Sequence, residues 1–240
     1  MFGFGTIINT LAIIFGGLTG MLFGNRLSDK HQNSLQSVCG IAVLFIGIAG
    51  TMEKMIHVEE GLLVSEGTLK IVLALTIGTL LGEFLNIEGK FEKFGEWLKQ
   101  KSNSVSDVKF VDGFVDASLT VCIGAMAIVG AINDGIYNDS SVLITKAILD
   151  FVIIMVMASS MGKGTVFSCI PVFLFQGSIT VLAKVIEPLL THGSLHYISL
   201  LGSILIFCVG LNLVWGKKVS VANMLPSLII GVIFSYITFF

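Results

Sequence analysis

The chain has 240 residues, of which 54% are hydrophobic and only 12% are charged, and its formal net charge at pH 7 is -2. Soluble domains carry about 25% charged residues, so this composition excludes an ordinary soluble domain and indicates an integral membrane protein. The small negative charge provides no basic surface for a nucleic acid. The four cysteines lie inside apolar segments without a CxxC pair, which predicts buried apolar side chains and no metal site.

Hydropathy predicts eight transmembrane helices, each near the roughly 20 residues that cross a bilayer. The first is interpreted as a span, because no basic segment precedes it and no small-residue cleavage site follows it. The expected fold class is an all-α membrane protein that forms one polytopic domain over residues 1–240. The predicted spans are 4–23, 34–52, 70–87, 111–132, 141–161, 165–186, 196–215 and 222–239.

The basic residues predict the orientation of these spans. With both termini outside, the inner side receives most of them, as the positive-inside rule requires. We therefore expect a multi-pass protein of a bacterial cytoplasmic (inner) membrane, with N- and C-termini outside. The inner set is Arg26, Lys30, Lys90, Lys93, Lys99, Lys101, Lys109, Lys163, Lys217 and Lys218, and the outer set is Lys54, Lys70 and Lys184.

An amphipathic helix is predicted after the third span, over residues 88–102. Ile87, Phe91, Phe94 and Leu98 recur at helical spacing, and charged residues cover the opposite side. Such a helix is expected to lie on the cytoplasmic membrane surface, with binding of a partner protein as the alternative.

Two parts of the chain resemble each other. Residues 5–9 (GTIIN) match residues 164–168 (GTVFS), and Gly40 with Phe45 matches Gly202 with Phe207 further along. Because the copies are five crossings apart, they would enter the membrane from opposite faces, as in many secondary transporters. The prediction is an inverted repeat of spans 1–3 and 6–8 around a central hairpin of spans 4–5 that acts as the gate. The corresponding parts are 1–87, 163–240 and 108–162.

Two series of glycines predict close helix packing. Gly16, Gly20 and Gly24 follow each other at four-residue spacing, as do Gly78 and Gly82. Small residues at this spacing let helix backbones approach closely. They predict packing within the chain or a homo-oligomer formed through these faces.

The central candidates for function are Lys146 and Asp150, one helical turn apart near the midplane of the fifth span. Ionisable residues at this depth are expensive and mark solute or ion pathways. We expect Lys146 to meet an anionic group and Asp150 to exchange a proton or a cation. The alternative is a neutralised pair that only fixes helix packing.

The fourth span contributes three further candidates. Asp116 lies near its inner end, and Asp134 follows 18 residues later, about 27 Å along a straight helix and hence at the outer edge. The turn of Asn133, Asp134 and Gly135 is expected to unwind the end of the span. Free carbonyls and a carboxylate there would suit a cation, whereas solvation at a helix end is the alternative.

Four polar residues on other spans complete the predicted pathway. Gln176 lies at mid-depth after Pro171, which predicts either a kink that frees carbonyl groups or a tolerated transmembrane proline. Glu83 is expected to pair across helices or to extend inward. Asn9 and Asn212 are expected to form hydrogen bonds between helices.

Enzymatic function is not expected. The sequence contains neither HExxH nor GxSxG, and no segment is long enough for a separate catalytic domain. We therefore predict no catalytic residues, no cofactor and no metal site. The expected partners are a small solute or ion and membrane lipid.

Several segments in order resemble the YdfK/YqgA-like bacterial membrane family, known as domain of unknown function 554. They are GTIINTLAIIFGGLTGMLFG, GTLLGEFLNIEGKFEKFGEWL, FVDGFVDASLTVCIGAMAIVGAINDG, TKAILDF, FSCIPVFLFQG and GLNLVWGKKVSVANMLPSL. The resemblance covers essentially the whole chain and implies a bacterial inner-membrane protein, often described as a transporter, without a substrate. It highlights Asn9, Glu83, Asp134, Gly135, Lys146, Asp150, Gln176 and Asn212, but it assigns no role to them.

The resulting prediction is a secondary transporter of a small polar or anionic solute, coupled to protons or sodium. Two alternatives remain. An oligomeric ion channel would place rings of Asp116 or Asp134 on its symmetry axis. A non-transporting membrane scaffold would use Lys146 and Asp150 only for packing.

Overall fold

The computed structural model describes residues 2–24, 26–59, 61–65 and 67–237, and helices dominate it. The elements are α1 (Phe4–Gly24), α2 (Asp29–Met55), β1 (Ile56–Glu59), β2 (Leu62–Ser65), α3 (Thr68–Leu85), α4 (Ile87–Lys101), α5 (Phe110–Cys122), α6 (Ala125–Ile136), α7 (Ser141–Met161), the 3₁₀ segment η1 (Gly162–Ser168), α8 (Cys169–Ile186), η2 (Glu187–Leu189), α9 (His192–Trp215), η3 (Val221–Met224) and α10 (Pro226–Ser235).

The helices confirm an all-α membrane protein. Within the described part of the chain, five stretches are long and apolar enough to cross a membrane: α1, α2 from Lys30, α3, the run of α7 with α8, and α9. The bent pair of α5 and α6 adds a sixth, and η3 with α10 is a shorter apolar helix. The expected eighth span extends to residue 239, and its last two residues lie outside the described part.

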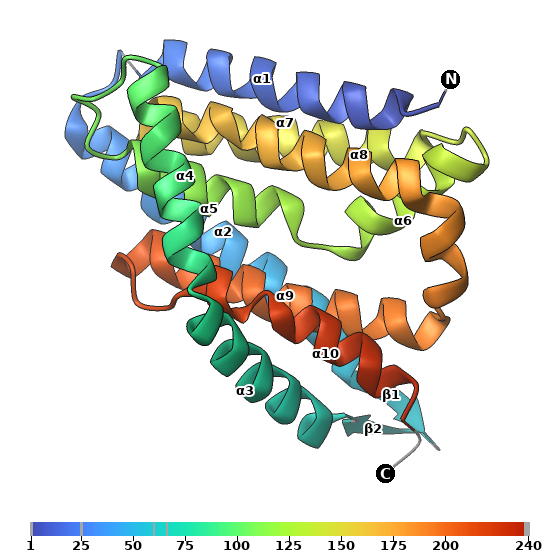
Figure 1. Cartoon of the computed structure of the whole chain (residues 1–240). Coiled ribbons are helices and arrows are strands. Elements are labelled where there is room, and N and C mark those ends of the chain that lie inside the picture. Colours follow the sequence, from blue (N-terminus) through green and yellow to red (C-terminus); the bar gives the residue numbers. More distant parts are fainter. Residues whose placement is uncertain (1, 25, 60, 66, 238–240) are drawn as a thin grey trace.

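The upper part of the bundle contains α1, α7 and α8, with α5 and α6 below them (Figure 1). A Cβ atom added to Gly16 would lie 2.5 Å from the Phe151 carbonyl oxygen, and one added to Gly20 would lie 2.1 Å from that of Met155. The residue numbers of the contacting positions increase together along both helices, so α1 and α7 run parallel. Gly24 meets Ser159 in the same way.

The lower part contains two antiparallel helix pairs, α2 with α9 and α3 with α10 (Figure 1). A Cβ added to Gly47 would meet the backbone of Phe207 at 2.6 Å, and one added to Gly82 would lie 1.8 Å from the Asn223 carbonyl oxygen. Gly78 meets Ser227 similarly. Both glycine series are thus occupied within the chain, and a homo-oligomer would need surfaces other than those expected from the sequence.

The fourth span is broken in its middle. α5 ends at Cys122, α6 begins at Ala125, and their axes differ by 62°. Gly124 at the break has φ +141°, a conformation that other residues rarely adopt. The sequence placed the irregular segment at residues 133–135, but Asn133, Asp134 and Gly135 are helical. A single glycine in an apolar run gave no stronger signal for the true position.

The predicted kink at Pro171 is also absent. The irregular segment is η1, which reverses the chain between α7 and α8, and Pro171 occupies the first turn of α8. Its missing N–H has no helical partner to lose there. The strands β1 and β2 pair antiparallel, which the sequence did not predict.

The amphipathic helix is confirmed as α4, and its apolar face packs on α5. The Phe94 ring lies 5.7 Å from the Phe114 ring between centroids, and Leu98 is buried. Protein therefore covers a face that the sequence assigned to the membrane surface, whereas Trp97 remains half exposed.

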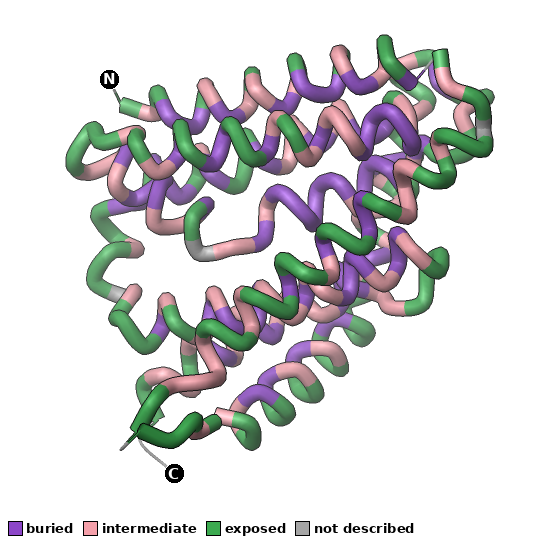
Figure 2. Tube along the Cα trace, turned by 180° about the vertical axis from the view of Figure 1, so that it is seen from behind, coloured by how far each residue is buried: buried purple, intermediate pink, exposed green. Residues whose placement is uncertain are grey.

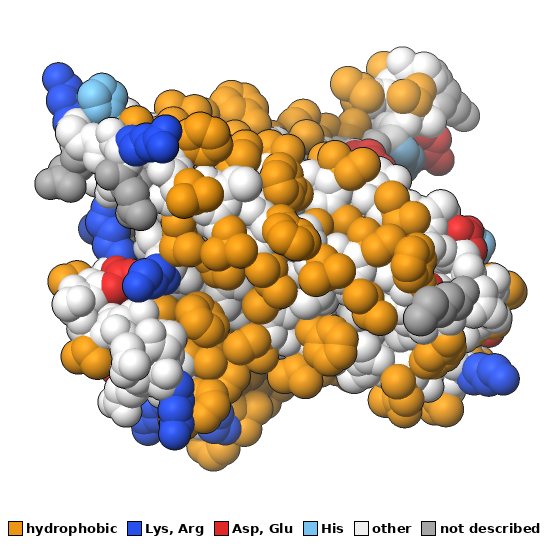
Figure 3. Space-filling view, turned by 90° about the horizontal axis from the view of Figure 1, so that it is seen from above, with side chains coloured by type: hydrophobic (Ala, Val, Ile, Leu, Met, Phe, Trp, Pro, Cys, Tyr) orange, Lys and Arg blue, Asp and Glu red, His pale blue; other side chains and the backbone are white. Residues whose placement is uncertain are grey.

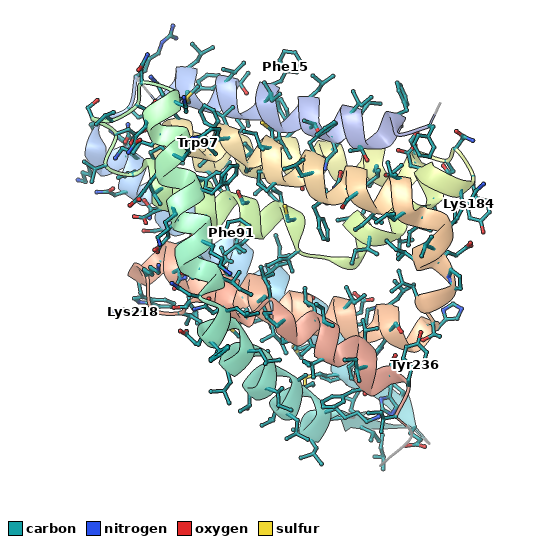
Figure 4. The ribbon with its side chains drawn as sticks, in the orientation of Figure 1. Phe15, Phe91, Trp97, Lys184, Lys218 and Tyr236 are labelled. Atoms are coloured by element: carbon teal, nitrogen blue, oxygen red, sulfur yellow. The ribbon has the colours of Figure 1, made fainter. Side chains whose placement is uncertain are left out.

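Buried residues lie where helices face each other, and exposed residues lie on the outside (Figure 2). Apolar side chains cover the middle of one face, and lysine and arginine side chains gather mainly at one end of it (Figure 3). Phe15 points away from the bundle, and Lys184 and Lys218 lie at opposite ends (Figure 4). α1 begins and α10 ends at the same end of the bundle (Figure 1).

Candidate functional site

A line of buried polar side chains runs between α1, α6, α7 and α8. We call this set the polar seam: Thr6, Asn9, Asp134, Lys146, Asp150, Gln176 and Thr180. All are at most 6% exposed. Polar groups at this depth require partners, because apolar surroundings cannot replace their hydration.

Lys146 and Asp150 form a salt bridge of 2.5 Å at one end of the seam. The Lys146 Nζ atom also donates a hydrogen bond of 2.8 Å to the Val121 carbonyl oxygen. Val121 belongs to the last turn of α5, where carbonyl groups lose their helical donors at the break. Lys146 therefore neutralises Asp150 and also satisfies the negative end of α5.

Asn9 connects this pair to α8. Its amide Nδ2 donates a hydrogen bond of 3.2 Å to Gln176 Oε1, and its side chain also interacts electrostatically with the Asp150 carboxylate. Gln176, which the sequence placed beside a kink, lies in a regular helix and is fully buried. The structure thus brings together four residues predicted separately from three spans.

The seam continues outward through two threonines to Asp134. Thr6 Oγ1 and Thr180 Oγ1 lie 3.3 Å apart. Asp134 Oδ2 accepts hydrogen bonds from the backbone N–H groups of Gly5 at 3.0 Å and Thr6 at 3.4 Å. The sequence placed Asp134 at the edge of a span, and it does lie beside the first turn of α1, at the end of that helix. It is fully buried there and caps α1, instead of being solvated as the alternative expected.

Three atoms of the seam lack hydrogen-bond partners: Asn9 Oδ1, Asp134 Oδ1 and Gln176 Nε2. Unsatisfied polar atoms are rare in buried sites, and each one calls for an explanation. Two of the three are acceptor oxygens, which is the chemistry that binds a cation.

A second polar region opens at the N-terminal end of α5, which the sequence expects on the inside, as a cavity of about 180 Å³ that we call the inner cavity. Asp116 lines it, as do Glu88, Glu92 and Lys217. Asp112, at the start of α5, is exposed. Since Asp116 and Val121 are five residues apart on α5, about 7.5 Å of helix separates this cavity from the seam.

Ion pairs hold the rim of the inner cavity. Lys217 Nζ lies 2.9 Å from Glu88 Oε1 and also pairs with Glu92. Burial lowers the pKa of Lys217, but the hydrogen bonds and charges of these glutamates outweigh it and raise the pKa above its usual range. Glu88 Oε2 also accepts from the N–H of Ala222 at 2.9 Å. The sequence placed Glu88 on a solvated face, whereas it is buried.

Besides Asp116 in the inner cavity, three predicted pathway residues lie outside the seam. Glu83 is exposed on α3. Asn133 is partly buried beside Tyr137 in a small pocket. Asn212 lines the inner cavity, but its amide already forms three hydrogen bonds in the loop after α9: Oδ1 accepts from Lys218 N and Val219 N, and Nδ2 donates to the Val219 carbonyl oxygen.

Sequence reasoning missed Thr6, Thr180 and Glu88. Thr6 is part of the repeated GTIIN segment, and Thr180 lies one turn from Gln176 on the same face. These spacings could have identified both residues, but threonine is common in transmembrane helices and therefore does not attract notice. Glu88 resembled the neighbouring charges of α4.

The comparisons with known proteins agree with this architecture. The family model described as "Protein of unknown function (DUF554)" matches residues 4–236. The membrane protein YdfK of Bacillus subtilis is 32% identical over 227 residues, covering 95% of this chain and 93% of YdfK. YqgA of Escherichia coli is 30% identical over 231 residues, covering 95% and 94%. No solved structure matches significantly. A family match across nearly the whole sequence, with two relatives aligned end to end, establishes that the chain belongs to the DUF554 family of membrane proteins.

Proposed function

We propose that this protein is an ion-coupled secondary transporter of a small polar or anionic solute. The observation that carries the proposal is the polar seam beside a broken span. Transporters of this class bind their solutes and ions near the midplane, where discontinuous helices present their ends to the site. Here Lys146 contacts the free end of α5 and Asp150 together.

An inverted repeat supports the same function. Three helix pairs are antiparallel: α1 with α8, α2 with α9 and α3 with α10. A two-fold axis in the membrane plane that exchanges the repeats would produce these three pairs. The matched residues also share their burial, since Thr6 and Thr165 are both buried, as are Asn9 and Ser168.

The central helices follow the same relation. Gly5 of α1 packs against Leu143 of α7, and the matching Gly164 packs against Phe110 of α5. Each arm of the central hairpin thus contacts the first helix of one repeat.

The proposal places the chain in a bacterial inner membrane with eight crossings. The short η3 and α10 would form the last crossing, and α5 with α6 the fourth. Both termini would then lie outside, with the inner cavity of Asp116 and Lys217 facing the cytoplasm. The excess of lysine and arginine at that end agrees with this orientation.

The mechanism gives distinct roles to the two ionisable residues. In the resting state Lys146 compensates Asp150. An anionic group of the solute would replace the Asp150 carboxylate as the partner of Lys146. Asp150 would then take up a proton or a cation, so that each transport state stays neutral at membrane depth.

Ion-coupled flux in proteoliposomes tests this function. A panel of small carboxylates and polar solutes is added under an inward Na⁺ or proton gradient, and ion entry is recorded. We expect solute-dependent ion entry with the wild type and with Asp139→Asn, a matched control in an exposed loop, but not with Asp150→Asn. Unchanged flux in Asp150→Asn, or flux at the level of protein-free liposomes for every solute, would refute the assignment.

A further inference from the structure

The polar seam contains one uncompensated buried charge. Asp134, Lys146 and Asp150 are each at most 6% exposed. Lys146 is fully engaged with Asp150 and with the Val121 carbonyl oxygen. Among the described residues, none of the salt bridges includes Asp134. With both acids ionised, the seam thus carries a net charge of one negative unit inside apolar surroundings, where an unpaired charge is strongly disfavoured.

The surroundings of Asp134 stabilise a carboxylate anion. Two backbone N–H groups, those of Gly5 and Thr6, point at its Oδ2 atom. They belong to the first turn of α1, a helix of 21 residues whose N-terminal end favours negative charge. Asp134 Oδ1 has no partner. These contacts occupy one carboxylate oxygen and leave the other free to accept a cation.

Neutral oxygen atoms lie on the adjoining turns of α1 and α8. The hydroxyl groups of Thr6 and Thr180 are 3.3 Å apart. The Asn9–Gln176 amide pair leaves Asn9 Oδ1 free. If both amides turned by 180°, Gln176 Oε1 would be free instead, so the pair supplies one amide oxygen in either orientation.

We propose that these residues form a Na⁺ site: Asp134 Oδ1, the hydroxyl oxygens of Thr6 and Thr180, and the free amide oxygen of the Asn9–Gln176 pair. One carboxylate with neutral oxygens balances a single positive charge, whereas Ca²⁺ and Mg²⁺ prefer more oxygen ligands or retain water molecules. Since the hydroxyl groups are already close together, Na⁺ would displace them less than the larger K⁺.

The site differs from the metal centres that sequence motifs reveal. The described residues contain no group of three or more His, Cys, Asp or Glu side chains that could hold a metal ion. The prediction of no metal site rested on the lack of CxxC and HExxH patterns in the sequence, but hydroxyl and amide oxygens suffice for Na⁺.

The site also explains how the ion would act on the solute. The inference extends the proposed function by naming its coupling ion. Asn9 supplies the free amide oxygen in the orientation seen here, and its side chain also interacts electrostatically with the Asp150 carboxylate. Drawing this oxygen onto Na⁺ would move the amide relative to Asp150 and so alter the partner available to Lys146.

The test measures Na⁺ binding without transport. The purified protein is unfolded by heat in detergent, with NaCl replaced stepwise by KCl at constant ionic strength. We expect the wild-type Tm to rise with Na⁺ along a saturation curve, by about 5–10 °C at a hundred times the Kd. Binding of ²²Na⁺ to the same sample should saturate at one ion per chain.

Matched variants locate the ion. Asp134→Asn keeps an acceptor for the α1 N–H groups but removes the charge, and should abolish the Na⁺-dependent shift and ²²Na⁺ binding. Thr180→Val keeps the volume and should raise the Kd at least tenfold, which provides a second measurement if Asp134→Asn does not fold. Asp139→Asn removes an exposed carboxylate outside the seam and should bind like the wild type.

Three outcomes would overturn the site. They are equal stabilisation of the wild type by Na⁺ and K⁺, stabilisation by acid alone, and Na⁺ binding that survives both Asp134→Asn and Thr180→Val. If the wild type shows no Na⁺ binding but transports solute with protons, the Na⁺ site is refuted and the proposed transport function is supported. If Na⁺ binds at one ion per chain and no solute is transported, the Na⁺ site is supported and the proposed transport function is refuted.

Discussion

Exchanging Lys146 and Asp150 tests whether this salt bridge is more than an isolated pair. The double variant Lys146→Asp/Asp150→Lys preserves both charges at the same spacing. A pair that only fixes packing should tolerate the exchange. The structure predicts otherwise, because Lys146 also donates to the Val121 carbonyl oxygen at the broken end of α5. Aspartate at position 146 would direct an acceptor at that oxygen.

The magnitudes follow from burial. The side chains of Lys146 and Asp150 are 8% and 5% exposed, and removing one partner of such a pair costs about 3–5 kcal/mol. For a chain of this length each kcal/mol lowers Tm by about 2–4 °C, so Lys146→Met should lower it by about 6–20 °C. The exchanged variant keeps the pair but leaves the Val121 carbonyl unsatisfied, at about 1–3 kcal/mol.

An apolar double variant completes the cycle. Lys146→Met/Asp150→Leu removes both charges, and such replacements are often neutral apart from the lost donor to Val121. Thermal unfolding in detergent should therefore rank the wild type first, the exchanged and apolar double variants next, and Lys146→Met last. The reasoning would be refuted if Lys146→Met matched the wild type, or if the exchanged variant lost no stability.

Three further measurements test the packing and the inner cavity. Gly82→Ala should destabilise the protein by about 1–3 kcal/mol, because its Cβ would lie 1.8 Å from the Asn223 carbonyl oxygen. The control Gly177→Ala adds a Cβ in open space on α8 and should be neutral or stabilising. Similar Tm values for the two variants would contradict this packing. Glu88→Gln removes a buried carboxylate that binds Lys217 and a backbone N–H of η3. It should lower the free energy of unfolding by about 1–3 kcal/mol, measured by thermal unfolding. An unchanged Tm would mean that the carboxylate is not needed there. The folded state raises the pKa of Lys217, so its stabilising effect should be present below the unfolded pKa near 10.5 and be lost only as pH rises through the higher folded value. Lys217→Met should therefore lower Tm equally at pH 6 and pH 9. A difference between these pH values would contradict the assignment.

The sequence predicts the apolar helices well, because each bilayer crossing needs a long hydrophobic run. The expected spans at 4–23 and 141–161 coincide with α1 and α7 within a residue. It also selects Lys146, Asp150, Asn9 and Gln176, since polar residues inside apolar runs are conspicuous. These four side chains contact one another in the structure.

The remaining features depend on tertiary contacts that no local pattern encodes. Asp134 is buried because α6 bends toward the first turn of α1, and a depth estimate along a straight helix cannot show that. Asn212 looks like Asn9 in sequence, yet loop backbone satisfies its whole amide. Glu83 and Glu88 lie five residues apart, and only the buried Glu88 accepts a hydrogen bond from the backbone of η3.

The two arms of the central hairpin pack differently. The sequence suggested that spans four and five move together between two fixed repeats. Gly16 and Gly20 bring the α7 backbone directly against α1. α6 joins α5 through Gly124, where added side-chain atoms would meet nothing within 4 Å.

Motion at Gly124 would separate Asp134 from the first turn of α1 and from Thr180 without disturbing the glycine contacts of α7. The proposed Na⁺ ligands come from α6 on one side and from α1 and α8 on the other. Binding of the ion would therefore hold α6 closed, and its release would require α6 to move. In the proposed transporter the broken half of the hairpin would gate the ion, while the intact half would hold Lys146 and Asp150 in place for the solute.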